Sequence, residues 1–359
     1  MADSKQAPLD AAAAAKAAFA SVQDKPFPDD IFTAPELRWA VIGCGVIANQ
    51  MAQSLALAGR KLAGVANRTL SKAQAFADQY GIEKVYDTVE DLYADPNIDA
   101  IYITTPHNTH ITYLRAALTA GKHVLCEKAI TLNSAELDEA RAIADEHNVV
   151  LMDATTVLHM PLYQELRRRM DAGEFGRMNL AQLNFGSYKE YGDLTNRFYN
   201  RNLAGGAMLD IGVYALSVMR LIMASQPVEV VSLGNTCETG VDVAGGIVCR
   251  NAEQQLGVVS LTLHSKQPKR SVISFDKCYI EVNEYPRADH ATIVWTADGH
   301  REEVHAGTEA YALCYEMADL EKAVAGDDSK RELLEYASDV MELMTKLRAD
   351  WGVVYPEEE

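Results

Sequence analysis

Long apolar runs are missing from this 359-residue sequence, since no segment approaches 18 consecutive apolar residues. A membrane-spanning helix needs about 20 such residues, so we expect none here. The six cysteines form no C-x-x-C pair and are scattered through apolar segments. This distribution is typical of free thiols in a reducing compartment and argues against disulfides or a zinc site. We therefore expect a cytoplasmic protein without a bound metal.

Positive charge is also scarce, because 33 lysines and arginines face 51 aspartates and glutamates, which leaves a net charge of -18. Phosphate backbones and anionic membranes need basic surfaces, so neither nucleic acid nor a membrane is an expected partner. The N-terminus lacks a basic region followed by a long apolar stretch, and we expect no signal peptide. An anionic cofactor can still bind in a local basic pocket.

One motif organises the chain. The stretch RWAVIGCGVIA at residues 38–48 predicts a strand, a tight glycine turn and the start of a helix. It fits G-x-G-x-x-A, with Gly43, Gly45 and Ala48 at the key positions. Gly45 lets a pyrophosphate approach the backbone, and the N–H groups of the helix start at Val46–Ile47 attract phosphates. The motif predicts dinucleotide binding, with a plain structural turn as the alternative.

Three parts are expected along the chain: an N-terminal arm (1–36), a Rossmann dinucleotide-binding domain (37–153), and a C-terminal α/β domain for substrate binding and oligomerisation (154–359). The arm combines an alanine-rich helix with a linker that contains three prolines. It is either a disordered tail or an arm that packs on a neighbouring subunit, and its role is left open.

Short apolar runs alternate with helical patterns across the second part, which predicts a parallel sheet covered by helices. Thr88 and Asn133 have the side chains of helix N-caps. The expected strands are 39–42, 62–66, 84–86, 100–104, 123–126 and 149–152, and the expected helices are 47–58, 71–80, 88–94, 108–119 and 133–147. Ligands of such a sheet bind beyond the carboxyl ends of its strands, so the loops that follow the strands should carry the site.

The loop after the second strand bears on the choice of cofactor. An NAD site usually has an acidic residue here, which holds the ribose hydroxyls and repels a 2′-phosphate. This chain has Asn67 instead, followed directly by Arg68 and then by Lys72. A guanidinium can stack on adenine and pair with a phosphate. The sequence therefore favours NADP, with NAD as the alternative.

Two further loops carry candidate residues. Thr105 and Pro106 follow the fourth strand and suit contacts to a cofactor ribose, and His110 is a candidate cofactor contact or a structural hydrogen-bonding residue. Glu127 and Lys128 follow the fifth strand. An ammonium at this position points toward the nicotinamide and can hold a substrate hydroxyl and stabilise an alkoxide. Taken alone, Glu-Lys is a common surface pair.

A glycine pair opens the main candidate helix of the C-terminal part. After Gly205-Gly206, Asp210 and Tyr214 stand at i and i+4, hence on one helix face. An acid one turn from a phenol can orient it or hold a substrate hydroxyl, and a nearby Lys128 would lower the pKa of the phenol. The alternative is a capped helix with a half-buried tyrosine.

Beyond residue 225 alternating segments predict an antiparallel sheet. One face of such a sheet packs on helices, and the other is left for a partner subunit. The expected strands of this part are 177–187, 228–234, 243–250, 256–265, 270–276, 278–283 and 291–296, and the expected helices are 161–171, 309–325 and 331–350. The tail at 355–359 is expected to fray.

With these motifs the chain resembles the Gfo/Idh/MocA oxidoreductase family over residues 38–356. The resemblance rests on the glycine turn, on Thr105-Pro106 with His110, on Glu127-Lys128, and on the Gly205-Gly206 helix with Asp210 and Tyr214. It implies an N-terminal Rossmann domain and a C-terminal α/β domain with an open, mostly antiparallel sheet. It also implies that Lys128 lies by the nicotinamide and the substrate, that Asp210 binds substrate, and that Tyr214 is the acid/base.

Tyrosine rather than histidine at position 214 resembles the branch that holds glucose–fructose oxidoreductase, dimeric dihydrodiol dehydrogenase and xylose dehydrogenase, which favours NADP. Two departures stand out. Ala129 replaces the proline that usually follows Glu-Lys. At 153–161 the relatives carry an aromatic residue and an arginine that meet substrate, whereas this chain has His159 and neighbours of other types. His159 becomes a candidate pocket residue, with loop packing as the alternative.

The prediction is an NAD(P)-dependent oxidoreductase that transfers hydride between the nicotinamide and a secondary alcohol or ketone of a carbohydrate-like substrate: a sugar, polyol or cyclic diol. Tyr214 removes the hydroxyl proton, Lys128 steadies the developing charge and Asp210 holds a neighbouring hydroxyl. Two alternatives stay open: cofactor-retaining chemistry, such as glycosidase-like elimination or intramolecular oxidoreduction, and a non-catalytic sensor of NADP and a metabolite. We expect a homodimer or homotetramer formed through the C-terminal sheet.

Overall fold

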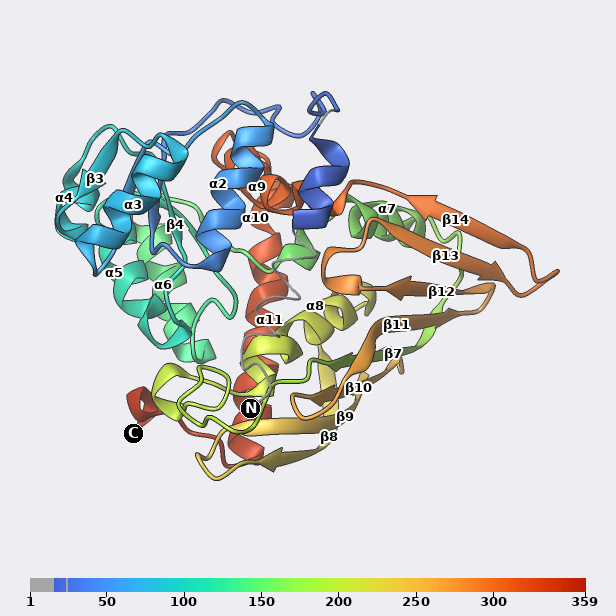
Figure 1. Cartoon of the computed structure of the whole chain (residues 1–359). Helices are drawn as coiled ribbons and strands as arrows, with labels where there is room; N and C mark the ends of the chain where they lie inside the picture. The colour runs from blue at the N-terminus through green and yellow to red at the C-terminus, as the bar shows by residue number, and fades with distance from the viewer. Residues whose placement is uncertain (1–15, 24) are drawn as a thin grey trace. The chain divides into compact units, whose positions relative to one another are not determined.

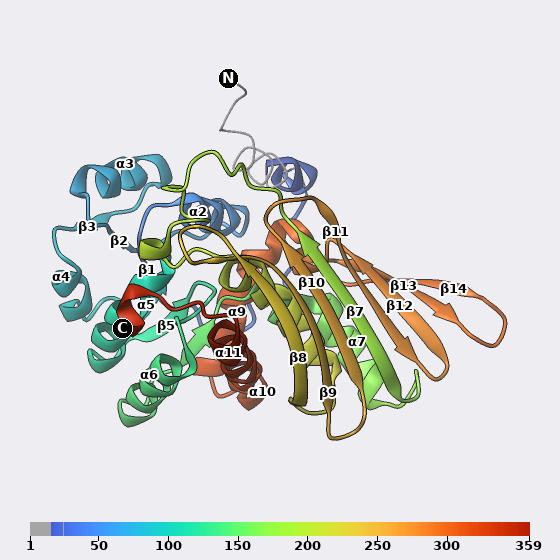
Figure 2. The ribbon, with the colours of Figure 1, turned by 90° about the horizontal axis from the view of Figure 1, so that it is seen from below.

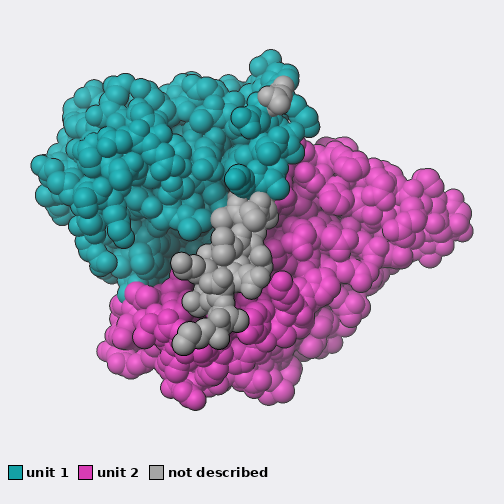
Figure 3. Space-filling model, in the orientation of Figure 1, with its two compact units in different colours: residues 1–154, 310–334 teal, residues 155–309, 335–359 magenta. Residues whose placement is uncertain are grey.

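The computed structural model describes residues 16–23 and 25–359, which form two compact units (Figure 1). Unit 1 holds the described residues up to Ala154 together with Ala310–Leu334. Unit 2 holds Thr155–Glu309 and Glu335–Glu359; Figure 3 colours the two units separately. Each unit is built around its own β-sheet.

The sheet of unit 1 has six parallel strands in the order β3-β2-β1-β4-β5-β6. The strands are β1 (Trp39–Ile42), β2 (Gly64–Ala66), β3 (Lys84–Tyr86), β4 (Ala100–Ile103), β5 (His123–Cys126) and β6 (Leu151–Asp153). The strand order reverses between β1 and β4, which is the switch point where such sheets bind dinucleotides. The predicted Rossmann domain is therefore confirmed.

The helices of unit 1 begin where the sequence provides caps. The Thr88 hydroxyl accepts the N–H of Asp91 at 3.1 Å, and the Asn133 side chain accepts the N–H of Glu136 at 3.0 Å, as predicted. The helices are α2 (Val46–Leu57), α3 (Leu70–Tyr80), α4 (Val89–Ala94), α5 (His110–Thr119), α6 (Ser134–Glu146), α9 (Ala312–Val324) and α10 (Asp328–Arg331), with a short turn η1 (His107–Thr109).

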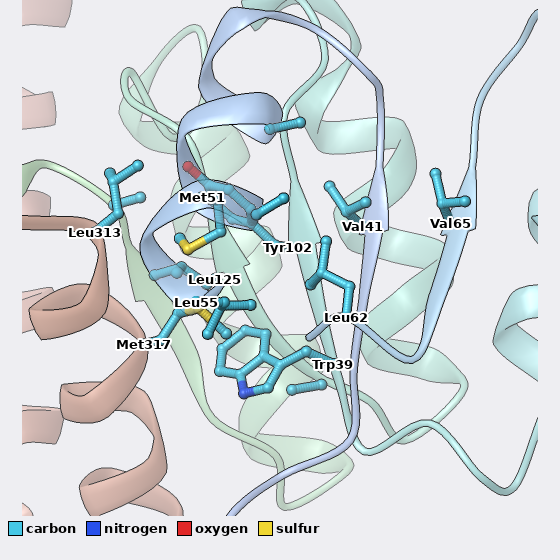
Figure 4. Packing of buried hydrophobic residues seen from close by; sticks show 14 of the residues in the cluster. Trp39, Val41, Met51, Leu55, Leu62, Val65, Tyr102, Leu125, Leu313 and Met317 are labelled. Carbon is cyan, nitrogen blue, oxygen red and sulfur yellow. The ribbon is translucent and has the colours of Figure 1, made fainter. Parts of the chain in front are cut away.

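Helix α9 is far along the chain, yet it belongs to unit 1. Figure 4 shows its residues Leu313 and Met317 in the same buried cluster as Trp39 of β1 and Met51 of α2. The Trp39 indole donates to Glu321 of α9 at 3.0 Å, and Arg60 pairs with the same carboxylate at 3.1 Å. The apolar face of α9 thus packs on the core of the Rossmann sheet. A division of the chain at residue 154 alone would assign this helix to the C-terminal domain.

The described part of the N-terminal arm packs on unit 1 itself. A helix spans residues 16–22, and Val22 and Ile31 are buried against Tyr311 and Cys314 at the start of the α9 region. The expectation of a disordered tail is therefore corrected for these residues, whereas a contact with another subunit stays a prediction. Residues 1–15, which include most of the alanine-rich segment, lie outside the described residues.

Unit 2 contains an eight-stranded sheet in the order β14-β13-β12-β11-β7-β10-β9-β8 (Figure 2). All neighbouring strands are antiparallel except β7 and β10, so the sheet is mixed and mostly antiparallel. The strands are β7 (Met178–Gly186), β8 (Pro227–Thr236), β9 (Asp242–Asn251), β10 (Leu256–Thr262), β11 (Gln267–Phe275), β12 (Cys278–Asn283), β13 (His290–Trp295) and β14 (Arg301–His305). Strand β14 was not predicted, because its sequence REEVH is almost entirely polar.

One face of this sheet packs on helices. A Cβ added to Gly257 of β10 would lie 2.4 Å from the sulfur of Met219 in α8, and one added to Gly245 of β9 would lie 2.4 Å from the Trp351 ring beyond α11. The helical elements of unit 2 are η2 (Thr156–Leu158), α7 (Pro161–Asp171), η3 (Arg201–Leu203), η4 (Met208–Gly212), α8 (Val213–Ile222), η5 (Tyr285–Arg287), η6 (Glu309–Tyr311), α11 (Leu333–Asp350) and η7 (Pro356–Glu358), of which η6 and α11 cross the unit boundary.

Among the described residues, Arg201–Ile222 is the one helical stretch long and apolar enough to cross a membrane by length and composition. Within its most apolar window, 83% is buried inside the protein, as is usual for a helix at the core of a fold.

Candidate functional site

The glycine motif forms the turn between β1 and α2 in unit 1. Gly43 has a φ of +104°, and its N–H donates to the carbonyl of Ala66 on β2 at 2.9 Å. A Cβ at position 43 would lie 2.5 Å from the Thr104 hydroxyl oxygen, so a side chain would clash as well as strain the backbone. The close approach of β1, β2 and the end of β4 thus requires glycine here.

The start of α2 has the properties of an anion site. Gly45 is its N-cap, provides no side-chain cap, and has open space where a Cβ would stand. The first helical residues, Val46 and Ile47, therefore present N–H groups at the positive end of the helix dipole. Ala48 is fully buried and keeps the helix close to the strands. These residues fit a dinucleotide pyrophosphate.

A pocket of about 170 Å³ adjoins this turn and is lined by Cys44, Gly45, Asn67, Arg68, Thr69 and Lys72. The Asn67 amide donates to the carbonyl of Thr69 at 3.0 Å, which shapes the loop after β2. Within residues 16–23 and 25–359, no carboxylate forms an ion pair with Arg68 or Lys72, although the protein is strongly acidic. Two cations without a carboxylate partner at the end of β2 fit a 2′-phosphate.

The Cys44 thiol lies in the same pocket. Partial burial raises its pKa to about 11, and the nearby Lys72 ammonium opposes that rise. The thiol is therefore neutral at physiological pH and adds no negative charge to this pocket.

The loop after β4 is organised by His110. This residue is fully buried, with one ring nitrogen 2.8 Å from the Thr105 carbonyl and the other 3.0 Å from the Ala129 carbonyl. Burial lowers the pKa of the imidazole. His110 links the loop after β4 to the loop after β5, so its placement fits the structural alternative, and the cofactor contact stays a prediction. Pro106 is exposed and precedes η1.

The loop after β5 presents Glu127 and Lys128. The buried Tyr102 hydroxyl on β4 donates to the Glu127 carboxylate, and the N–H of Lys128 donates to the same carboxylate at 3.3 Å. The Lys128 side chain is half-buried, and the peptide bond that follows it, to Ala129, is cis. The carboxylate thus holds the loop that carries the ammonium at the carboxyl end of the sheet.

The second group of candidate residues lies in unit 2. After Gly205-Gly206, the chain forms a π-helical turn, η4, that continues directly into α8. Asp210 lies on the π-helical turn and Tyr214 in α8, so the expectation of one regular helix is corrected. A Cβ on Gly212 would lie 2.9 Å from both Leu261 and Met208, which explains the small residue inside this irregular turn. Such turns are frequent at functional sites.

Arg197 supplies a guanidinium that the sequence analysis missed. Its Nη2 lies 3.3 Å from the Asp210 carboxylate, and its guanidinium lies over the Phe198 ring at 4.5 Å. The Arg197 side chain is 61% exposed and that of Asp210 is 13% exposed. The pair therefore offers both a donor and an acceptor at the surface of unit 2. The arginine comes from the loop after β7, not from residues 153–161, and no motif links it to Asp210 in sequence.

His159 follows η2 in unit 2 and is 1% exposed. Its backbone carbonyl accepts a hydrogen bond from the Gln164 side chain at 3.3 Å. Burial to this degree fits the loop-packing alternative better than a substrate contact.

Asp242, a fully buried residue at the start of β9, is a second residue that sequence reasoning missed. Its Oδ2 accepts the N–H of Met208, the first residue of η4, at 2.6 Å. Burial raises the pKa of Asp242 to about 6, while backbone N–H groups and Arg348 act in the opposite direction. The carboxyl caps the helical stretch that carries Asp210 and Tyr214 from a distant strand, so no local sequence pattern reveals it.

Comparison with known proteins defines the class first. Residues 37–155 match the model of an oxidoreductase family with an NAD-binding Rossmann fold, and residues 163–281 match the model of the GFO/IDH/MocA C-terminal domain. The mouse trans-1,2-dihydrobenzene-1,2-diol dehydrogenase is 32% identical over 254 residues, which cover 69% of this chain and 75% of that protein. The chain therefore belongs to the GFO/IDH/MocA family and is an NAD(P)-dependent oxidoreductase.

Other relatives agree. The pig trans-1,2-dihydrobenzene-1,2-diol dehydrogenase is 28% identical over 340 residues, covering 90% of this chain and 99% of that protein. Among solved structures, a levoglucosan dehydrogenase in complex with NADH and levoglucosan has a TM-score of 0.76 at 19% identity, covering 87% of this chain and 97% of that chain. A 3-ketoreductase from Actinomadura kijaniata in complex with NADP has a TM-score of 0.75 at 23% identity, covering 88% and 98%. These two structures show the shared fold.

The Asp242 pKa makes the stability of the fold depend on pH. The pKa of Asp242 in the folded protein lies above the ordinary value of 3.8. Protonation of Asp242 therefore contributes its full stabilisation of the fold at pH values below 3.8, and this stabilisation is lost as the pH rises through about 6. The whole effect is on the order of 3 kcal/mol, of which roughly 1 kcal/mol falls between about pH 5.5 and 7.5. Asp242→Asn should remove this dependence. Urea unfolding of both proteins across that range measures it, and a difference in unfolding free energy that stays constant with pH would contradict the assignment.

Proposed function

We propose that this protein is an NADP-dependent dehydrogenase or reductase that acts on a secondary alcohol, or the matching ketone, of a sugar, polyol or cyclic diol. The observation that carries the proposal is Lys128 at the carboxyl end of β5, in a sheet whose first turn fits a dinucleotide. The relatives named trans-1,2-dihydrobenzene-1,2-diol dehydrogenase support oxidation of a diol. Bound NADP supplies the hydride acceptor.

In this proposal three side chains handle the substrate. During oxidation Tyr214 takes the proton of the reacting hydroxyl, and in the reverse direction it returns the proton. The Lys128 ammonium stabilises the negative charge that develops on the substrate oxygen. Asp210 accepts a hydrogen bond from a neighbouring hydroxyl.

The Asp210–Arg197 pair favours substrates with two adjacent hydroxyl groups. The carboxylate can accept from one hydroxyl while the guanidinium donates to the oxygen of the next. A substrate with a single hydroxyl would leave one of the two groups without that contact. This argument supports sugars, polyols and cyclic diols over simple alcohols.

The first test uses two single variants, Tyr214→Phe and Lys128→Met. Because each change removes a group that acts on the reacting oxygen, we expect kcat to fall roughly 10²–10⁴-fold while NADPH binding is kept. Turnover is measured by NADPH absorbance with a panel of sugars and cyclic diols, and binding by NADPH fluorescence. Lys61→Met, which removes an exposed lysine paired with Glu83, is the control and should keep full activity.

The outcomes of this test distinguish the three functional hypotheses: a dehydrogenase or reductase, an enzyme with cofactor-retaining chemistry, and a non-catalytic sensor. Full activity in either active-site variant would refute the assigned roles. Tightly bound nucleotide with substrate conversion but no net NADPH change would favour cofactor-retaining chemistry. Nucleotide binding without any conversion across the panel would favour a sensor.

We also propose that the cofactor is NADP rather than NAD, since Arg68 and Lys72 line the pocket after β2 and no acidic residue follows that strand directly. A hydrogen bond to a charged group contributes about 1.5–3 kcal/mol, so Arg68→Ala with Lys72→Ala should raise the KM for NADPH roughly tenfold to a hundredfold or more. The KM for NADH should change little. Steady-state kinetics with both nucleotides measure the ratio, and an equal loss for the two would contradict the 2′-phosphate contact.

We further propose that the open face of the unit 2 sheet binds a second copy of the chain. Val231 and Leu233 on β8 are 75% and 83% exposed, and Val248 and Leu256 of the adjoining strands are also exposed. Val231 pairs with Val248 across the strands, which makes the apolar surface continuous. Exposed apolar patches of this kind mark interaction sites. The opposite face of the sheet is already packed, as the Trp351 contact of Gly245 shows.

Charges placed in this patch should separate the copies. We expect Val231→Glu with Leu233→Glu to reduce the solution mass to that of one chain, because two copies would have to bury unpaired charges of the same sign. Light scattering after size-exclusion chromatography measures the mass. Leu70→Lys, a change at an exposed leucine of unit 1, is the control and should keep the wild-type mass. A wild-type protein that is already monomeric would contradict the proposal.

We propose a cytoplasmic location, and the state of the cysteines is the observation that supports it. All six are free thiols, and four of them are buried, which suits a reducing compartment.

A further inference from the structure

The C-terminal segment that was expected to fray is anchored in unit 2. Tyr355 is 0% exposed, and its hydroxyl donates to the carbonyl of Gly205 at 2.7 Å. The glycine pair that precedes the Asp210–Tyr214 stretch is therefore bound, through one backbone carbonyl, by a residue 150 positions further along the chain.

The segment is held in turn by α11. Arg348, a buried residue near the end of that helix, forms two parallel hydrogen bonds with Glu358 at 2.8 and 2.9 Å and lies over the Tyr355 ring at 4.7 Å. Glu358 also accepts the N–H of Tyr355 at 3.0 Å. A bidentate charged pair of this kind is stronger and more directional than a single bond, so the position of the Tyr355 ring is fixed from two sides.

The turn that Tyr355 contacts has little freedom of its own. Gly206 has a φ of +125°, and a Cβ there would lie 2.3 Å from the Asp242 carboxylate. The N–H of Gly206 donates to the Phe198 carbonyl at 2.9 Å, and the Gly206 carbonyl accepts the N–H of Asp210 at 3.3 Å. A shift of this turn would therefore move the backbone of Asp210 directly and, through the continuous helix, that of Tyr214.

From these contacts we propose that Tyr355 is a positioning residue: the segment Gly352–Glu359 clamps the Gly205-Gly206 turn and thereby holds Asp210 and Tyr214 in the geometry that the reaction needs. The proposal rests on the function proposed above for those two residues. In this proposal Tyr355 itself contacts neither substrate nor cofactor. Asp242 accepts the first N–H of the same helical stretch, so Tyr355 anchors the carbonyl of Gly205 and Asp242 anchors the N–H of Met208.

A matched pair of variants tests the clamp. Tyr355→Phe removes one hydroxyl that donates to a backbone carbonyl at 2.7 Å, and Tyr163→Phe removes another, also buried, that donates to the Tyr285 carbonyl at 2.8 Å. Both should lower the urea midpoint by a similar amount. Only Tyr355→Phe should lower kcat, by roughly threefold to tenfold, since one hydrogen bond of ordinary strength is lost from the turn. The KM and the dissociation constant for NADPH should not change in either variant.

Glu358→Gln provides a second measurement that leaves the tyrosine in place. It weakens the link to Arg348 and should lower kcat in the same direction as Tyr355→Phe, at unchanged NADPH affinity. Equal kcat values for Tyr355→Phe and Tyr163→Phe would overturn the positioning role, as would a loss in Tyr355→Phe that appears only in nucleotide binding.

Failure of this inference is distinguishable from failure of the proposed function. If Tyr214→Phe stays active, the function assigned to the helix is wrong, whatever Tyr355→Phe does. If Tyr214→Phe is inactive while Tyr355→Phe matches its control, the helix carries the reaction and the clamp alone is refuted.

Discussion

Both parts of the candidate site depend on backbone that approaches a neighbouring segment more closely than a side chain would allow. In unit 1, a Cβ on Gly43 would stand 2.5 Å from the Thr104 hydroxyl, and in unit 2, a Cβ on Gly205 would stand 2.7 Å from two backbone carbonyls. Each glycine is followed by a helical stretch that carries candidate site residues: Val46 and Ile47 in unit 1, and Asp210 and Tyr214 in unit 2. Glycine is therefore needed here for packing, and in unit 1 the helix that follows begins at an open N-cap, Gly45.

Close approach of backbone brings polar groups together, and these groups need partners once they are buried. In unit 1 the need is met by long side chains: Glu321 binds the Trp39 indole and Arg60, and His110 lies between two carbonyls. In unit 2 it is met by Asp242 and Tyr355. Such groups hold loops in place through these hydrogen bonds, so a histidine or aspartate in a motif is not by itself evidence of a binding residue.

The comparison of sequence and structure shows which signals are local. The glycine turn, the caps at Thr88 and Asn133 and the order of strand and helix in unit 1 depend on neighbours within a few residues, and all are found where the sequence predicts them. Strand β14 was missed because strand-forming alternation is absent from its polar sequence. Arg197, Asp242 and Tyr355 were missed, or misjudged, because their partners lie between 13 and 150 positions away. The π-helical turn at Asp210 contains Gly212, which packs against Leu261 of β10, and no periodicity reveals this packing.

The acidic composition of the chain supports the assignment of an anion site in unit 1. With 51 acidic and 33 basic residues, a cation has many carboxylates available to it, and buried or half-buried arginines such as Arg60, Arg169 and Arg348 are indeed paired. In the part of the chain that the structure describes, Arg68 and Lys72 have no such ion pair, and they line the same pocket beside a helix start that lacks a side-chain cap. An unpaired cation in an acidic protein gains most from a ligand phosphate, because no carboxylate has to be displaced first. Net charge and local charge therefore have opposite signs here, and the local sign decides what the pocket can bind.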